Sequence, residues 1–465
     1  MIPRKSSFRY QLGFWATIIT TLVIIVMLEV LSAKNNYSID LTRYQQHSLS
    51  QPTKKLLDSL NHDIQLTAFI GIDAPEYKQV KKLCQQYADY NRRISYRFID
   101  PNRNPGLMKH YELVKYGQEK HGTLIVETGN QKEIVKVVNE ESITNAILRL
   151  THPSRKVIYF LMGHGENDPF MPTNLETFKS NPKSYRLARE ALEERIWKVK
   201  ELYLVSGNRV PEDASLLIVC GPEFEIPPEE IKAIEGYVTR GGRVFFLLDP
   251  FTGREFKELL QKYNIILGDD IIIDNVNRIQ GSDFLTPVVS TYVDHIITKD
   301  LSTLSTVFSW ARSVNYEPSF VPGLDVQALL KTSPESWGTE NLEGINRGDV
   351  TFFPPKDKKG PFLLGVVATS VQGKKLTRLA VIGDSDFASD IYINLYANRD
   401  LFLNIVSWLG EEEGLITIKV KSHQYQYNPL NTHQSHILFW FPVVIQPGLI
   451  ILIGVLVSVW RRIRS

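Results

Sequence analysis

Six acidic or histidine side chains stand directly after buried-type strands, the positions at which an α/β sheet presents its loops. They are His164, Glu166, Asp168, Asp249, Asp384 and Asp386. Because ligands of open α/β sheets bind beyond the carboxyl ends of the strands, the six predict one polar rim. Carboxylate and imidazole groups suit a divalent metal ion or the hydroxyl groups of a glycan. The alternative is that glycine makes tight turns there while Asp and His cap backbone amides. No H-E-x-x-H spacing occurs, so the identity of any metal stays open.

Cys220 ends a predicted strand, as the nucleophile of an amidotransferase would. It is followed by Gly221-Pro222, and neither G-x-C-x-G nor G-x-S-x-G occurs in the chain. A nucleophile needs a sharp elbow of small residues and a His–acid partner, so Cys220 is predicted to be a buried structural residue. The phosphate-cradling G-x-x-x-x-G-K-[ST] is also missing, which excludes an ATPase. We therefore expect no catalytic residue, no cofactor and no enzymatic activity.

The elements that must position the rim are predicted between residues 156 and 415. Apolar strands alternate with amphipathic helices there, which is typical of a doubly wound parallel sheet. Helix 228–240 is one clear case, because it opens with Pro and acidic residues and ends at Gly241-Gly242. Residues 275–372 interrupt the rhythm with Ser, Thr, Pro and Gly and short β-like pieces, including 351–353. They predict a β-rich insert within one domain.

A separate unit is predicted over residues 40–150. Its strands and helices follow the order β-α-β-α-β-β, which resembles a thioredoxin-like fold. The redox Cys-x-x-Cys is missing, since Cys84 stands alone in a predicted helix. We expect a thioredoxin-like scaffold without redox chemistry.

Two apolar runs, 14–31 and 437–460, are long enough to cross about 30 Å of hydrocarbon. A cleaved signal peptide is the alternative for the first run, although it is long for that purpose. Basic residues lie in segments 1–13 and 461–465, so the positive-inside rule places both termini in the cytoplasm. The middle of the chain would then lie outside the inner membrane, in the periplasm or the cell exterior.

The overall composition narrows the class of protein. The chain has 465 residues, 53 basic and 51 acidic side chains and a net charge of +2. This balance argues against a nucleic-acid-binding protein. With only two cysteines, the chain is neither a disulfide-dense scaffold nor a cysteine-rich metal site.

Several short motifs occur in a specific order along nearly the whole chain. They are YFLMGHGE at 159–166, GYVTRGGRVFFLLDP at 236–250, VIGDSDFAS at 381–389 and NIVSWLGEEE at 404–413. In this the chain resembles the GldG-type auxiliary components of ABC transporters associated with gliding motility. The resemblance implies a membrane-anchored extracytoplasmic subunit whose central domain is similar to class I glutamine amidotransferase-like folds. It also implies permease and ATPase partners, which must be separate chains because no other stretch could span the membrane.

The sequence therefore predicts a non-catalytic auxiliary subunit of an ABC export or mechanochemical complex. Its ectodomain would recruit an envelope partner or substrate, with a glycan, a lipid or a protein all left open. Two alternatives remain: an envelope enzyme acting on glycan or peptide through a His164/Asp384 rim, and a structural tether between membrane and envelope.

Overall fold

The structure is a computed structural model. It describes residues 20–21, 27, 48–111, 113, 122–151, 156–171, 183–204, 209–279, 284–318, 321–348, 350–354, 356–373, 375–411 and 439–448. The chain divides between Leu49 and Ser50 into two compact units, and every element described here from α2 onward lies in the second. The apolar runs 14–31 and 437–460 fall almost entirely outside the described residues. Within the described residues, no helix is both long enough and apolar enough to cross a membrane.

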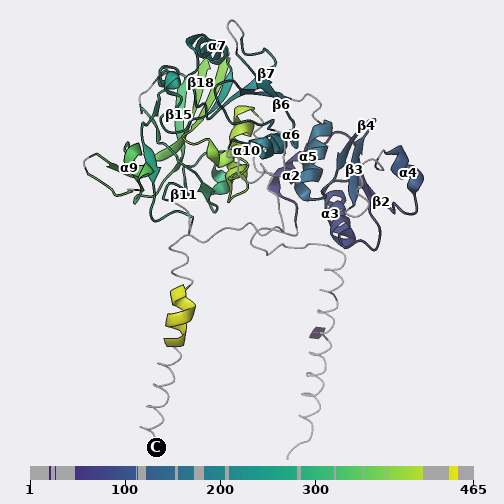
Figure 1. Cartoon of the computed structure of the whole chain (residues 1–465). Coiled ribbons are helices and arrows are strands. Elements are labelled where there is room, and N and C mark those ends of the chain that lie inside the picture. Colours follow the sequence, from purple (N-terminus) through teal and green to yellow (C-terminus); the bar gives the residue numbers. More distant parts are fainter. Residues whose placement is uncertain are drawn as a thin grey trace, which may run out of the picture. The chain divides into compact units, whose positions relative to one another are not determined.

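A four-stranded sheet forms the first part of the second unit (Figure 1). Its order is β2-β1-β3-β4; β1 and β2 are parallel, whereas β3 runs antiparallel to β1 and β4 antiparallel to β3. The elements are α2 (Gln51–Asp58), β1 (Ile64–Phe69), α3 (Tyr77–Tyr90), β2 (Ile94–Ile99), α4 (Pro105–His110), β3 (Thr123–Thr128), β4 (Gln131–Val135) and α5 (Glu140–Thr151).

Helix α5 is buried on almost every side, because it contacts β3 and β4 as well as α2. Two of its buried polar side chains form hydrogen bonds inside the protein. Glu140 accepts a hydrogen bond from the backbone of Ser50 at 2.6 Å, and Thr144 bonds to Thr53 and to the hydroxyl of Tyr87. This buried network joins α2, α3 and α5 into one layer.

An eight-stranded mixed sheet forms the larger part, in the order β12-β15-β18-β19-β8-β7-β5-β6. The five strands from β19 to β6 are parallel, and the other three pair antiparallel. The parallel strands and their helices are β5 (Lys156–Leu161), α6 (Arg186–Glu193), β6 (Trp197–Leu202), β7 (Ala214–Cys220), α7 (Pro228–Thr239), β8 (Arg243–Leu247), η2 (Arg254–Phe256), α8 (Lys257–Gln261), β19 (Lys375–Ile382), η4 (Asp386–Ala388) and α10 (Asn398–Leu409).

Alternate residues of the central strands enter two hydrophobic cores, one on each face of the sheet. In β5, Ile158 and Phe160 face the core shared with α6 and α10, whereas Tyr159 and Leu161 face the core shared with α7 and α8. A strand that is buried on both faces must be apolar throughout, which explains the continuous hydrophobic runs in the sequence. If the five parallel strands are numbered along the chain, their order across the sheet from β6 to β19 is 2-1-3-4-5. The direction in which successive strands are added therefore reverses between β5 and β7.

The predicted insert contributes strands to the main sheet. Strands β12, β15 and β18 extend the main sheet, and β18 forms a hairpin with β19. Residues 351–353, predicted as a strand, have no regular structure. The remaining elements of this part are β9 (Ile265–Leu267), β10 (Ile271–Ile273), β11 (Val288–Val289), β12 (Thr291–Tyr292), η3 (Lys299–Leu301), β13 (Thr306–Val307), β14 (Val314–Tyr316), β15 (Leu324–Lys331), β16 (Trp337–Thr339), α9 (Leu342–Asn346), β17 (Lys358–Lys359) and β18 (Leu363–Gln372).

Candidate functional site

The carboxyl ends of the five parallel strands meet at one edge of the sheet, and the predicted rim residues lie there. His164, Glu166 and Asp168 follow β5, Asp249 follows β8, and Asp384 and Asp386 follow β19. The side chains do not form a single group. The contacts divide them into a carboxyl cluster beyond β8 and β19 and a histidine group beyond β5 and β7.

The carboxyl cluster consists of Asp249, Asp384 and Asp386. Asp249 accepts two hydrogen bonds from Ser385, one from its backbone amide at 2.6 Å and one from its hydroxyl at 2.7 Å. Asp384 accepts from the backbone amides of Asp386 at 2.7 Å and Ser309 at 2.8 Å. Asp249 and Asp384 therefore hold loop backbone in place, as capping carboxylates do.

Burial raises the pKa of all three carboxyl groups in this cluster. The pKa of Asp384 lies well above its usual range, because the charges of Asp386 and Asp249 add to the effect of burial. Burial and the charge of Asp249 raise the pKa of Asp386 to about 7. For Asp249 the hydrogen bonds from Ser385 oppose the effect of burial. Like charges at close range disfavour ionisation, so burial and mutual repulsion both oppose full ionisation of the cluster.

The histidine group consists of His164, Glu166 and Glu230. Nδ1 of His164 lies 3.0 Å from Oε1 of Glu166, and Nε2 lies 3.5 Å from Oε2 of Glu230 in α7. Glu166 also accepts from the His164 backbone amide at 2.6 Å. Burial raises the pKa of Glu230, while His164 lowers it. The described structure contains no hydrogen bond or ion pair between His164 and Asp384, so the expected joint rim is split in two.

A buried link joins the loops that carry the two groups. The Asn167 side chain donates to the Ser385 hydroxyl at 2.9 Å, and the Tyr185 hydroxyl donates to the Ser385 carbonyl. Gly221 lies against this link with a φ of 61°; a Cβ there would stand 2.5 Å from the Ser385 hydroxyl and 3.0 Å from Asp249. Only glycine fits both the left-handed backbone and the space.

The surroundings of Cys220 and Asp168 also suit a structural role rather than a chemical one. The Cys220 thiol is 1% exposed, and burial raises its pKa well above the usual range, so the reactive thiolate does not form. Asp168 accepts from the Phe170 backbone amide at 2.6 Å. Both residues are used to build the loops. The prediction that Cys220 is buried is confirmed.

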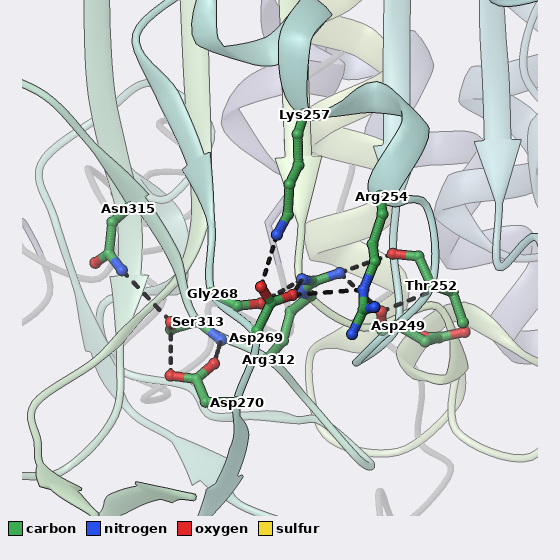
Figure 2. A network of polar contacts seen from close by, with 10 residues as sticks. All are labelled: Asp249, Thr252, Arg254, Lys257, Gly268, Asp269, Asp270, Arg312, Ser313 and Asn315. Carbon is green, nitrogen blue, oxygen red and sulfur yellow. Dashed lines mark hydrogen bonds and ion pairs between the residues drawn. The ribbon is translucent and has the colours of Figure 1, made fainter. Parts of the chain in front are cut away.

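Arg312 fastens a segment of the predicted insert to the carboxyl cluster (Figure 2). Its side chain is 0% exposed and donates to the carbonyl oxygens of Gly268, Asp249 and Thr252 at 2.7, 3.1 and 2.9 Å. It also reaches the Asp269 carboxylate at 3.2 Å, which Lys257 and Arg254 share. The Arg312 backbone amide bonds to the carbonyl of Gly383 at 2.7 Å, directly before Asp384.

Reasoning from sequence did not identify Asn167, Ser385, Glu230 or Arg312. Asn167 and Ser385 are direct neighbours of predicted rim residues, so their place in the sequence could have identified them. Glu230 and Arg312 come from α7 and from the insert, and no spacing in the sequence relates them to the rim. Among the residues that the structure describes, no group of three or more His, Cys, Asp or Glu side chains could hold a metal ion.

Fold and site together define a mixed α/β protein with an open eight-stranded sheet, whose rim carboxylates mostly bind backbone amides. The profile of a family described as an ABC-type uncharacterized transport system matches residues 155–405, more than half of the chain. The chain belongs to this family of ABC transport auxiliary proteins. A domain of unknown function matches residues 43–147. Association with an ABC transport system follows from the family.

The other comparisons add little. No curated protein matches the chain. A solved structure described as the mmIFT52 N-terminal domain is 18% identical, with 54% of this chain and 97% of that chain covered and a TM-score of 0.38. A structure described as ThuA-like, from Bacteroides uniformis, is 15% identical, with 54% and 90% covered and a TM-score of 0.32. Likenesses this weak carry no argument about function.

Proposed function

We propose that this chain is a non-catalytic, membrane-anchored auxiliary subunit of a gliding-motility-type ABC transporter. Helices at 14–31 and 437–460 anchor it in the inner membrane, both termini face the cytoplasm, and the α/β part lies outside. Permease and ATPase are separate chains. The family supports the association with an ABC system, and the apolar runs with their basic flanks support the anchoring.

The observation that carries the non-catalytic role is the use of the rim side chains. Glu166, Asp168, Asp249 and Asp384 each accept a hydrogen bond from a backbone amide at 2.6 to 2.8 Å. A carboxylate that holds a loop amide is poorly placed to move a proton on a substrate. The enzyme alternative relied on His164 acting with Asp384, and these two residues belong to separate groups.

The finer fold assignments are part of the same proposal. The sheet order β2-β1-β3-β4, with β3 antiparallel to β1, supports a thioredoxin-like N-terminal domain. The parallel order 2-1-3-4-5 supports a central domain related to class I glutamine amidotransferases. In such a domain Cys220 stands at a strand end but is buried and protonated. The proposed subunit thus keeps the scaffold and lacks the nucleophile.

Affinity purification of the full chain in mild detergent, followed by mass spectrometry, tests this proposal. We expect a polytopic permease and an ATPase to co-purify, with no ATP turnover by the chain alone. Replacing Gly448 and Gly454 by Leu should weaken co-purification and leave thermal unfolding of the α/β part unchanged, because small residues permit close helix approach. ATP turnover by the isolated chain, or purification without a permease, would contradict the proposal.

A further inference from the structure

Two exposed aromatic rings border the loop after β5, where the strand order reverses. Tyr203, which follows β6, is 52% exposed, and Phe224, which follows β7, is 67% exposed. A Cβ on Gly163 would lie 3.9 Å from the Tyr203 ring, and one on Gly165 would lie 3.1 Å from the Phe224 ring. Both rings therefore lie next to the same short loop. We call Tyr203, Phe224 and loop 163–165 the aromatic surface.

The aromatic surface is held in place by hydrogen bonds within the protein. The backbone amides of Glu223 and Phe224 both donate to the His164 carbonyl at 2.9 Å. Gly163 and Gly165 have φ values of 126° and 80°, which residues with side chains rarely adopt. A side chain at Gly165 would also displace the Phe224 ring. Rings that are fixed before binding lose little conformational entropy when a partner covers them.

The surroundings of the aromatic surface are negatively charged. The pKa of Tyr203 is raised by burial first and then by Glu201 and by the charges of Asp168 and Glu166. Lys183 pairs with Glu223 at 2.7 Å, so these two charges offset each other. Glu225 and Glu229 are exposed nearby along the chain from Phe224.

We propose that the aromatic surface docks a basic segment of a partner protein, with an Arg or Lys side chain stacked on the rings. A cation over an aromatic face is attracted by the ring, and the carboxylates around the rings add to that attraction. A neutral glycan would gain from stacking but not from the negative charge. This inference goes beyond the proposed function and does not depend on the transporter association.

Fluorescence anisotropy with the full chain in detergent tests the proposal. The probe is a short fluorescein-labelled peptide of alternating arginine and glycine; the comparison ligands are the same peptide with citrulline in place of arginine, and maltoheptaose as competitor. We expect the arginine peptide to bind and salt to weaken it. Tyr203→Ala and Phe224→Ala should each raise the Kd about fivefold. The double variant Glu225→Gln, Glu229→Gln should also raise the Kd and reduce its salt dependence.

Phe353→Ala is the matched control, because the exposure of Phe353, 62%, is close to that of Phe224 and it lies in another part of the chain. It should leave the Kd unchanged. Equal effects of Phe353→Ala and Phe224→Ala, or no binding of the arginine peptide, would overturn the proposal. Competition by maltoheptaose that depends on Phe224 would overturn it in favour of a glycan. None of these results requires a permease, so they are separate from the test of the proposed function.

Discussion

Arg312→Met provides a direct test of the idea that the insert is fastened to the carboxyl cluster. Methionine retains much of the aliphatic stem and removes the guanidinium. The carbonyl oxygens of Thr252 and Gly268 would lose the guanidinium donor. The Asp249 carbonyl would keep the amide and hydroxyl of Thr252, and Asp269 would keep Lys257 and Arg254. An unsatisfied buried acceptor costs about 1–3 kcal/mol. Since burying the guanidinium also carries a desolvation cost, we expect a net loss of about 3–5 kcal/mol.

Urea unfolding followed by tryptophan fluorescence measures this loss, and the midpoint should fall by about 1 M or more. Hydrogen exchange at the Ser309 and Ser385 amides should rise as well, because their acceptors lie next to the Arg312 contacts. Arg312→Lys should give an intermediate loss, since it keeps the charge but not the planar fork. Arg347→Met is the control: Arg347 pairs with Glu343 on the surface and is 75% exposed. If Arg312→Met were as stable as Arg347→Met, the reasoning would be refuted.

Three further predictions concern the cluster, the thiol and the topology. The pKa of Asp386 rises from 3.8 to about 7 on folding, so its contribution to stability is present below pH about 4 and is lost as the pH rises through about 7. Asp386→Asn should remove this part of the pH dependence when the free energy of unfolding is measured across that range. An unchanged pH profile would contradict this role of Asp386. Cys220→Ala should preserve co-purification with the permease and cost about 1 kcal/mol of stability, because the thiol is buried and protonated; loss of function in a folded variant would point to chemistry at Cys220. A reporter active only in the periplasm should work after Gln45, and one active only in the cytoplasm after Ser465; cytoplasmic activity after Gln45 would contradict the proposed topology.

Local patterns in the sequence predicted the central strands well, because a strand buried on both faces leaves an unmistakable apolar run. The predicted helix 228–240 matches α7 closely. The amphipathic spacing of residues 185–197 predicts one helix from the sequence alone, but α6 ends at Glu193 and Trp197 already begins β6. Its apolar spacing continued into the strand, so the boundary could not be read from periodicity.

Non-local pairing accounts for what the sequence could not predict. Helix α5 was missed because it is buried on nearly all sides and contains Thr144, whose hydroxyl bonds to Thr53 and Tyr87 of other elements. Nothing local in the sequence of the insert shows that β15 and β18 join the main sheet. The position of each rim residue beyond a strand end followed from the strand order. Which of them touch depends on α7 and on residues 309–313, which approach from elsewhere in the chain.

The most direct measurement of the central claim is cross-linking in native membranes followed by mass spectrometry of the full chain and its neighbours. We expect cross-links from the terminal apolar segments to a polytopic ABC permease, and fewer of them when Gly448 and Gly454 are both replaced by Leu. A chain that is monomeric in the membrane, with no permease among its cross-linked neighbours, would contradict the auxiliary-subunit assignment.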